Sequence, residues 1–241
     1  MIFNAYTFSD IGGKAKNEDS VWINNEKSRL FAIVADGLGS HGGGEIASAA
    51  VVETIRRNLP ARGFAEPAEL SHCVKAANAA VIARQKPGLA MKSTVVLLAV
   101  EENMAFFAHV GDSRGYMFRN GRIIHQTLDH SVSQLSVLRG EITSAQIRFH
   151  ESRNQLMRAL GGEESVSETI SAMPPLFPGD AFLLCTDGFW EYVTEIEMET
   201  DLVKSANTEA WVSYMLARIG KRAVDGRDNL SAIAVICGGA R

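Results

Sequence analysis

Short apolar runs mark the predicted strands of this chain. Residues 31–35, 95–100, 105–110, 181–185 and 232–236 are almost entirely apolar, a pattern typical of buried strands. A polar Glu-Glu-Asn stretch lies between the second and third of these runs, which predicts a hairpin. Antiparallel pairing is therefore expected in at least part of the sheet structure.

Weaker signals predict further strands and three helices. Strands are expected at 2–9 and 21–24, and the Asn-Gly turn at 120–121 predicts a second hairpin between 116–118 and 122–126. Apolar residues recur at helical spacing in three further segments, 43–59, 67–85 and 212–219. Because helices are followed by adjacent hairpin strands and do not alternate with single strands, the pattern predicts an α+β fold with antiparallel sheets.

A polar stretch interrupts this pattern at residues 129–164. It contains only short apolar segments and is punctuated by glycines, so we expect an excursion on the surface of the domain. Long ordered excursions of this kind often act as lids or binding flaps. Since no linker or internal repeat divides the chain, residues 1–241 are expected to form one domain.

Composition and charge limit the classes of partner. The 241 residues are 46% hydrophobic and 22% charged, as in ordinary globular proteins. The formal net charge of −4 gives no general attraction to nucleic acid or to an anionic membrane. There is no apolar run of the roughly 20 residues that span a bilayer, and the three cysteines are widely spaced. We expect a cytoplasmic protein without nucleic-acid or membrane partners.

Four aspartates share one kind of position along the chain. Asp36, Asp112 and Asp187 each follow an apolar strand, and Asp228 directly precedes the last one. A single aspartate there is commonly a turn former, but neighbouring strands would bring all four carboxylates together. Like charges so close need cations to stay ionised. A cluster of oxygen ligands without His or Cys suits Mg²⁺ or Mn²⁺.

One competing motif overlaps the first aspartate. Residues 37–42 match Gly-x-Gly-x-x-Gly after a strand and before a helix, as in a dinucleotide-binding fingerprint. Asp36 would then face the pyrophosphate with a negative charge, and a second helix follows where a βαβ unit needs a strand. Dinucleotide binding is therefore disfavoured.

As a set, the motifs resemble the metal-dependent serine/threonine protein phosphatases of the type 2C (PPM) family, in particular its bacterial-type single-domain members. The matching segments are residues 12–19, 34–41, 44–48, 110–114, 129–131, 156–161, 185–190 and 228–231. The resemblance implies a four-layer α-β-β-α sandwich, in which two packed antiparallel sheets are flanked by helices and a metal centre lies in a cleft at one edge. Residues 131–164 correspond to the family's flap.

The resemblance also implies a role for each site residue. Asp36 would bridge two Mn²⁺ or Mg²⁺ ions, the carbonyl of Gly37 would bind one of them, and Asp187 and Asp228 would complete the ligand set. Two further acids, Glu18 and Asp19, would hold water molecules bound to the metals. Asp112 would help Asp187 to hold a third, weakly bound ion.

Two positions depart from the family pattern. Lys14 stands where members commonly have an arginine that binds the substrate phosphate, so weaker substrate binding is expected. Lys16 or Arg114 are alternatives for that contact, although a structural ion pair is the expected role of Arg114. Leu38 replaces a histidine proposed as general acid in some members, and His41, three residues on, is expected to be structural.

These features predict a phosphatase that removes phosphate from phosphoserine or phosphothreonine by attack of a water molecule bridging the metals. Its partners would be a phosphorylated protein and a cognate Ser/Thr kinase, and it would act as a monomer. Two alternatives stay open at this point. One is a phosphatase-like binding module that has lost turnover, and the other is an enzyme acting on small phosphoesters.

Overall fold

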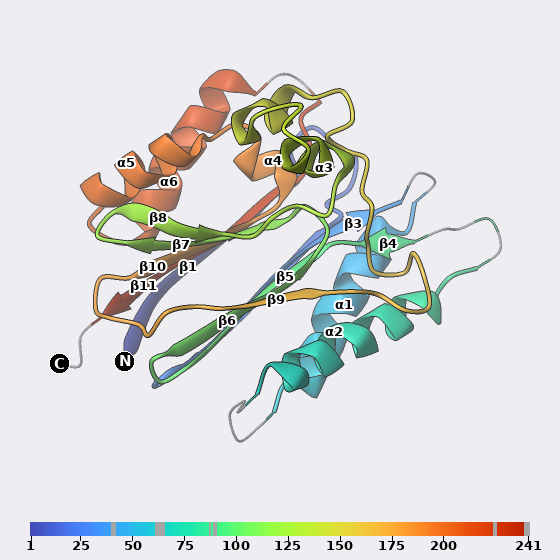
Figure 1. Ribbon diagram of the computed structural model, residues 1–241, viewed down its shortest axis with the longest axis horizontal. Coiled ribbons are helices and arrows are strands. Elements are labelled where there is room, and N and C mark those ends of the chain that lie inside the picture. Colours follow the sequence, from blue (N-terminus) through green and yellow to red (C-terminus); the bar gives the residue numbers. More distant parts are fainter. Residues whose placement is uncertain (40–41, 61–65, 87, 89–90, 224–225, 239–241) are drawn as a thin grey trace.

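The structure is a computed structural model, and it describes residues 1–39, 42–60, 66–86, 88, 91–223 and 226–238 (Figure 1). Two antiparallel sheets face each other. The first has the strand order β1 (Ile2–Asp10), β11 (Leu230–Gly238), β10 (Ala181–Cys185), β7 (Arg114–Arg119) and β8 (Arg122–Gln126). The second has the order β2 (Asp19–Glu26), β3 (Arg29–Leu38), β5 (Val95–Glu101), β6 (Met104–Val110) and β9 (Thr169–Ala172), with β4 (Lys92–Ser93) paired to β3.

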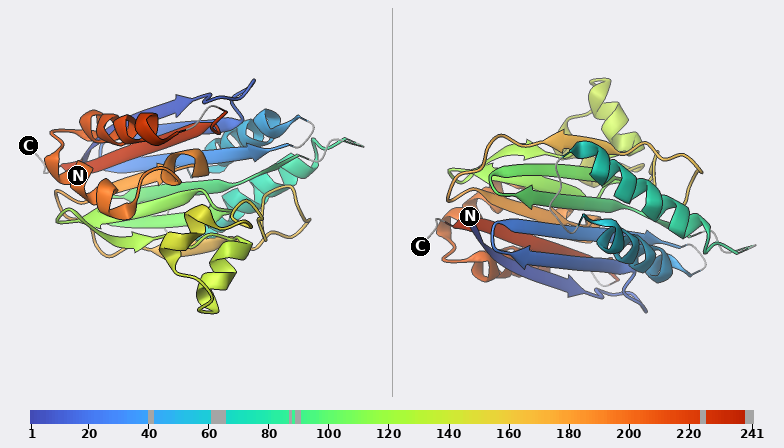
Figure 2. Two further views of the ribbon diagram at one scale, coloured as in Figure 1. Left: turned by 90° about the horizontal axis from the view of Figure 1, so that it is seen from above. Right: turned by 90° about the horizontal axis from the view of Figure 1, so that it is seen from below.

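Helices cover the outer face of each sheet. The second sheet is covered by α1 (Gly44–Asn58) and α2 (Pro67–Ile82), and the first by α5 (Glu195–Lys204) and α6 (Thr208–Arg222). Figure 2 shows the two helical layers from opposite sides of the sheets. The predicted four-layer α-β-β-α sandwich is therefore confirmed. None of the helices in the described ranges has the length and apolar character needed to cross a bilayer.

The apolar runs are explained by burial on both strand faces. In β5, Leu97 and Ala99 pack into the core beneath α1 and α2, whereas Leu98 and Val100 pack between the two sheets. Successive side chains of a strand point to opposite faces. A strand with cores on both sides therefore has no position for a polar residue, and the predicted hairpin of β5 and β6 is confirmed.

The first two helices begin within one residue of the prediction, whereas α6 begins at Thr208, four residues before the predicted segment 212–219, and not all of the helices were expected. Pro67 occupies the first turn of α2, and Glu66 and Glu69 form a capping box there. This helix ends at Ile82, earlier than the expected stop at residue 87, which lies outside the described residues. The helices α5 and α4 (Asp187–Trp190), the strands β4 and β9, and the short helical segments within 129–164 were not predicted.

The polar stretch at 129–164 contains two short helical segments, α3 (Val132–Leu138) and the 3₁₀ helix η1 (Ser144–Phe149). It lies on the side of the first sheet that carries α4 (Asp187–Trp190) (Figure 1). The stretch is attached at its base, because Arg114 forms a buried bidentate pair with Asp129 at 2.7 and 2.8 Å. It is therefore an ordered excursion on a fixed anchor.

Candidate metal centre

Asp36 lies near the end of β3, but it does not terminate the strand as predicted. The strand continues to Leu38 because the two residues of β4 pair with it, Ser93 opposite Gly37 and Lys92 opposite Leu38. A two-residue strand has no recognisable sequence pattern, so the extension could not be predicted. It means that Asp36 is held by paired backbone on both sides.

Hydrogen bonds fix the backbone of Asp36 further. Its N–H donates to Thr94 Oγ1 at 3.0 Å, and its carbonyl accepts from Thr94 N–H at 2.8 Å and from Ser93 Oγ at 2.9 Å. Thr94 Oγ1 also bonds Ser113 Oγ at 2.7 Å. Because Ser113 follows Asp112, the same network joins the loops that carry these two aspartates.

Gly37 allows three segments to meet closely. A Cβ at Gly37 would lie 2.0 Å from the carbonyl oxygen of Gly44 and 2.7 Å from that of Glu18, so no other residue fits without a shift of the backbone. The Gly37 N–H donates to the Glu18 carbonyl at 3.0 Å. The start of α1 and the loop before β2 are thereby brought against the end of β3.

Asp187 and Asp228 are brought together from two neighbouring strands. Asp187 follows β10 and begins α4, and Asp228 lies just before β11, the strand paired with β10. A Cβ at Gly188 would lie 2.1 Å from the Asn229 carbonyl oxygen, so this approach again requires glycine. The two carboxylates therefore lie on adjacent strands at the same edge of the first sheet.

Asn229 ties this edge to the N-terminal loop, a role that sequence analysis missed. Its side-chain oxygen accepts from Glu18 N–H at 2.8 Å, and its amide donates to the carbonyls of Ile11 at 2.7 Å and Lys16 at 3.0 Å. Asparagine supplies both donor and acceptor for such a bridge. The contact joins residues more than 200 positions apart, and only its place in the 228–231 motif marks it in the sequence.

The negative charges of the carboxylates at this edge repel one another. Burial raises the pKa of Asp36 well above its ordinary value, and the negative charges of Asp187, Asp19 and Asp112 raise it further. Burial likewise raises the pKa of Asp187, followed by the charges of Asp112 and Glu191. Among the described residues, these two carboxylates therefore have no cationic partner that would favour their ionised forms.

Two more predicted acids share this environment. Burial raises the pKa of Asp112 to about 7, with a further contribution from Asp129. Burial also raises the pKa of Asp19 to about 6, although hydrogen bonds to its carboxylate oppose the rise. Asp19 Oδ2 accepts from Thr186 Oγ1 at 3.0 Å, whereas Asp19 Oδ1 is buried and has no hydrogen-bond partner among the residues that the structure describes. Burial raises the pKa of Glu18 as well, followed by the charge of Glu45.

The basic residues near the centre have distinct partners. Lys14 Nζ lies 3.1 Å from Asp228 Oδ2, and both side chains are about half exposed. Lys16 pairs with Glu45 at the start of α1, and Arg114 is fully buried against Asp129, which confirms its structural role. Of the three candidates for phosphate binding, Lys14 is thus the one that reaches a predicted metal ligand. His41 lies outside the described residues.

A cavity of about 170 Å³ opens at this edge. It is lined by Lys14, Arg153, Asn154, Asp187, Gly188, Glu191, Tyr192, Gly226, Arg227 and Asp228. The excursion therefore borders the carboxylates through Arg153 and Asn154, and Arg153 is held there by Glu191 at 2.9 Å.

The donor atoms fit a hard divalent cation in kind, because they are carboxylate and carbonyl oxygens. Within the described ranges, no three His, Cys, Asp or Glu side chains converge into a group ready to enclose an ion. Asp228 instead reaches Lys14, and Asp187 Oδ1 accepts from Gly188 N–H at 2.6 Å. The predicted ligands are therefore gathered at one edge without forming a closed coordination shell. The unpartnered Asp19 Oδ1 and the mutual repulsion of the acids both favour a cation there.

Sequence comparison finds similar proteins among bacterial phosphatases. A family model described as Protein phosphatase 2C matches residues 9–233. The serine/threonine phosphatase stp of Listeria monocytogenes is 32% identical over 201 residues, covering 80% of this chain and 79% of that protein. The serine/threonine protein phosphatase PstP of Mycobacterium tuberculosis is 36% identical over 186 residues, which is 76% of this chain but only 35% of PstP. The chain thus spans about a third of the PstP length.

Solved structures agree with this result. The M. tuberculosis serine/threonine phosphatase PstP/Ppp superposes with a TM-score of 0.87 at 28% identity, over 99% of this chain and all of that one. A structure of the PstP catalytic domain in complex with two manganese ions has a TM-score of 0.81 at 27% identity, and 99% of each chain is covered.

Proposed function

Because the chain belongs to the protein phosphatase 2C family, we propose that it hydrolyses phosphoserine and phosphothreonine in proteins with the help of bound divalent metal ions. The observation that carries the proposal is the gathering of Asp36, Asp187, Asp112 and Asp19 at one edge of the sandwich. Burial raises the pKa of each, and the negative charges of neighbouring acids raise it further. Buried carboxylates of this kind are expected at a site for a cation.

Two Mn²⁺ or Mg²⁺ ions are proposed as the cofactors. Asp36, the carbonyl of Gly37, Asp187 and Asp228 would hold them, which is supported by their oxygen donors and by the two manganese ions in the related PstP domain. Ions bound there would lower the pKa of a coordinated water and neutralise negative charge on the phosphoryl oxygens. The chain then needs no nucleophilic serine or cysteine.

Other acids would support this ligand set. Asp19 Oδ1 is buried and unpartnered, so we assign Asp19, with Glu18, to hydrogen bonds with water at the metals. Asp112 and Asp187 would offer a third, weaker site, which is supported by the nearby charge of Asp112, because it raises the pKa of Asp187. Thr186 orients Asp19 through its hydroxyl hydrogen bond.

Lys14 would bind the phosphate of the substrate. Its side chain lines the cavity, its ammonium group pairs with Asp228, and it is partly exposed. The position of Leu38 has no ionisable group, so this side chain cannot protonate the leaving alkoxide. We therefore assign substrate binding and orientation, and not proton transfer, to the side chains around the metal ligands.

The substrates would be phosphorylated proteins supplied by a Ser/Thr kinase. We propose that residues 1–241 act as one catalytic domain in which 131–164 serve as the flap. This is supported by the position of Asn154 at the cavity. The three cysteines are free and buried, which suits the proposed cytoplasmic location.

Metal-dependent turnover tests this function. We expect hydrolysis of p-nitrophenyl phosphate and of a phosphothreonine peptide with Mn²⁺ or Mg²⁺, and none with EDTA. Asp187→Asn should lower turnover by more than about a hundredfold, because it removes a ligand charge. Glu209→Gln, at the exposed start of α6, loses the same charge and should keep full activity.

Calorimetric titration with Mn²⁺ provides a second readout, and Asp187→Asn should bind the ion more weakly. Turnover that persists in EDTA would contradict the metal-dependent mechanism. A folded, metal-binding protein that hydrolyses neither substrate would overturn the enzymatic proposal and favour a binding module.

A further inference from the structure

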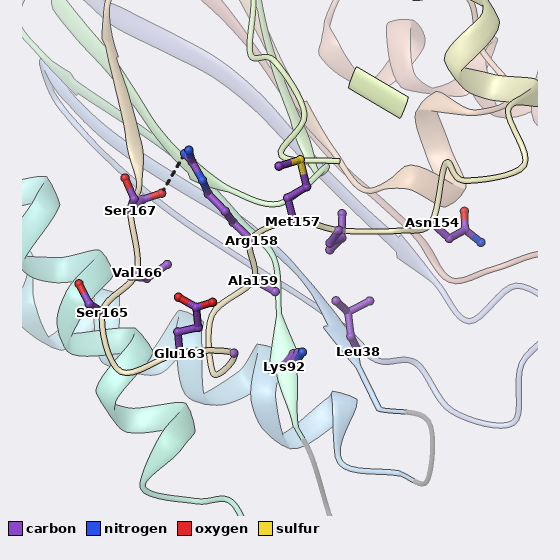
Figure 3. Close-up of a pocket in the computed structure, with 12 residues that line it drawn as sticks. Leu38, Lys92, Asn154, Met157, Arg158, Ala159, Glu163, Ser165, Val166 and Ser167 are labelled. Atoms are coloured by element: carbon purple, nitrogen blue, oxygen red, sulfur yellow. Dashed lines mark hydrogen bonds between the residues drawn. The ribbon is translucent and has the colours of Figure 1, made fainter. Parts of the chain in front are cut away.

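A second, larger cavity adjoins the candidate metal centre. Its volume is about 520 Å³, within the range of ligand-binding pockets. Asn154 lines both cavities, and Leu38 lies two residues after Asp36 on β3. We call this cavity the basic groove, and its residues used below are Leu38, Lys92, Asn154, Met157, Arg158 and Glu163 (Figure 3). The groove is therefore continuous with the edge that carries the carboxylates.

Backbone hydrogen bonds hold the walls of the basic groove in place. Lys92 on β4 is paired opposite Leu38 on β3. The flap returns along the other side of β4, because Ser93 and Leu160 exchange backbone hydrogen bonds at 3.0 and 2.8 Å. Asn78 of α2 accepts from Gly161 N–H at 2.7 Å and holds the following turn. The groove therefore keeps its shape without a ligand.

Two cations line this groove without a carboxylate partner. Within the ranges that the structure describes, the ammonium group of Lys92 has no ion pair or hydrogen bond. Arg158 has one long hydrogen bond, at 3.4 Å to the carbonyl of Ser167, which Figure 3 shows. Glu163 also lines the groove, but no ion pair joins it to either cation. By contrast, Arg153 a few residues earlier is paired with Glu191.

Apolar surface completes the groove. Leu38 is partly exposed on one wall, and Met157 on the other is 56% exposed. A groove with apolar walls and free cations suits a peptide segment that carries negative charge. Phosphorylated segments adjoining further acidic groups have that character.

We propose that the basic groove binds the substrate residues next to the phosphorylated residue, and that Lys92 binds an acidic group on them. This inference rests on the proposed phosphatase function. With the phosphate at Lys14 and Asp228, the substrate chain passes Asn154 and enters the groove. The acidic group is a carboxylate of Asp or Glu or a second phosphate, because an exposed ammonium binds either as a point charge.

Charge reversal at Lys92 tests this proposal. Three phosphothreonine peptides are compared: one with neutral neighbours, one with glutamates on both sides, and one with a second phosphothreonine. Lys92→Glu should lower the ratio of kcat/KM for the acidic peptides to kcat/KM for the neutral peptide by at least about fivefold. The peptide that loses most identifies the preferred acidic group.

Lys27→Glu is the matched control, since it makes the same change of charge at an exposed residue in the turn between β2 and β3, at the end of β3 opposite to Asp36 and Leu38. It should leave the ratio unchanged, and a thermal melt checks that both variants fold. An unchanged ratio in Lys92→Glu would overturn the proposal.

Fluorescence anisotropy of the labelled peptides measures binding without turnover. If the wild-type protein hydrolyses none of the peptides, the proposed function fails. The groove proposal would still be supported if the wild-type protein bound the acidic peptides more tightly than the neutral one and Lys92→Glu removed this preference. Equal binding of all three peptides by both proteins would contradict it.

Discussion

The surroundings of a fully buried carboxylate in one region of the molecule differ from those of the partly buried carboxylates Asp36 and Asp187 in another. Between α5 and α6, Asp201 is fully buried and accepts two hydrogen bonds from Arg218, at 2.7 and 2.9 Å. Burial raises the pKa of Asp201, but the hydrogen bonds and charges of Arg218 and Lys204 outweigh it, so the pKa lies below its ordinary value. At the candidate metal centre burial also raises the pKa values of Asp36 and Asp187, and there the neighbouring acids raise them further.

The difference between the two regions indicates the role of the acids at the candidate metal centre. The helical region shows that this chain supplies arginines where a buried acid is structural, as Arg114 does for Asp129. Leaving a buried charge without a partner costs several kcal/mol, roughly 3–5 kcal/mol when a partner is removed. The unpaired acids of the centre therefore point to a cation from outside the chain, which agrees with the proposed metal binding.

The largest effect that we expect from this comparison follows removal of a paired acid. Asp201→Asn keeps the shape of the side chain but leaves Arg218 with Glu197, its other partner at 2.8 Å. The free energy of unfolding should fall by about 3 kcal/mol. Urea denaturation measures the change, and phosphatase turnover at low temperature should stay at the wild-type level. A variant as stable as the wild type would show that the arginine network is not structural.

Removal of an unpaired acid should have the opposite sign. In EDTA at pH 8, Asp112→Asn should raise the free energy of unfolding by about 2 kcal/mol, because the buried charge is lost. The pKa of Asp112 is raised from 3.8 to about 7 by folding, so its ionisation destabilises the folded state above pH 7. The penalty declines as the pH falls through 7 and is absent below about pH 4, where both states are protonated.

Denaturation of the variant and the wild type at several pH values measures this difference and cancels the other titrating groups. A gain that persists at pH 4 would contradict the electrostatic explanation. Loss of stability at pH 8 would show that Asp112 is a structural acid like Asp201.

The local part of this organisation could be predicted from the sequence. Asp36 and Asp187 were recognised because strand, aspartate and glycine are adjacent in the chain, and the buried runs identified the central strands. The helix α5 was missed because its exposed Ile196 and Val203 do not form a stripe with the buried Met198. The strand β9 has four residues and no fully buried one, so it left no pattern.

Contacts between distant segments could not be predicted. Lys14 and Asp228 are 214 residues apart, and their ion pair depends on how Asn229 holds the N-terminal loop. The basic groove depends on the pairing of β4 with both β3 and Leu160, near the end of the polar stretch 129–164. Such contacts are determined by how distant segments pack against each other, and the sequence pattern of a single segment does not predict this packing.

The smallest effect that we expect concerns the ion pair between Lys14 and Asp228. Among the described residues, it is the one ion pair at the candidate metal centre that joins a basic side chain to a predicted metal ligand. Lys14 and Asp228 are about half exposed, so their pairing contributes little, about 1 kcal/mol or less, and Lys14 is free to bind phosphate. Lys14→Arg would offer a bidentate contact, and we expect the KM for a phosphothreonine peptide to fall about fivefold with kcat unchanged. Lys16→Arg is the control, because Lys16 pairs with Glu45 and should leave KM unchanged. Since Asp228 stays in place in both variants, equal KM values would mean that Lys14 serves Asp228 and does not contact the substrate.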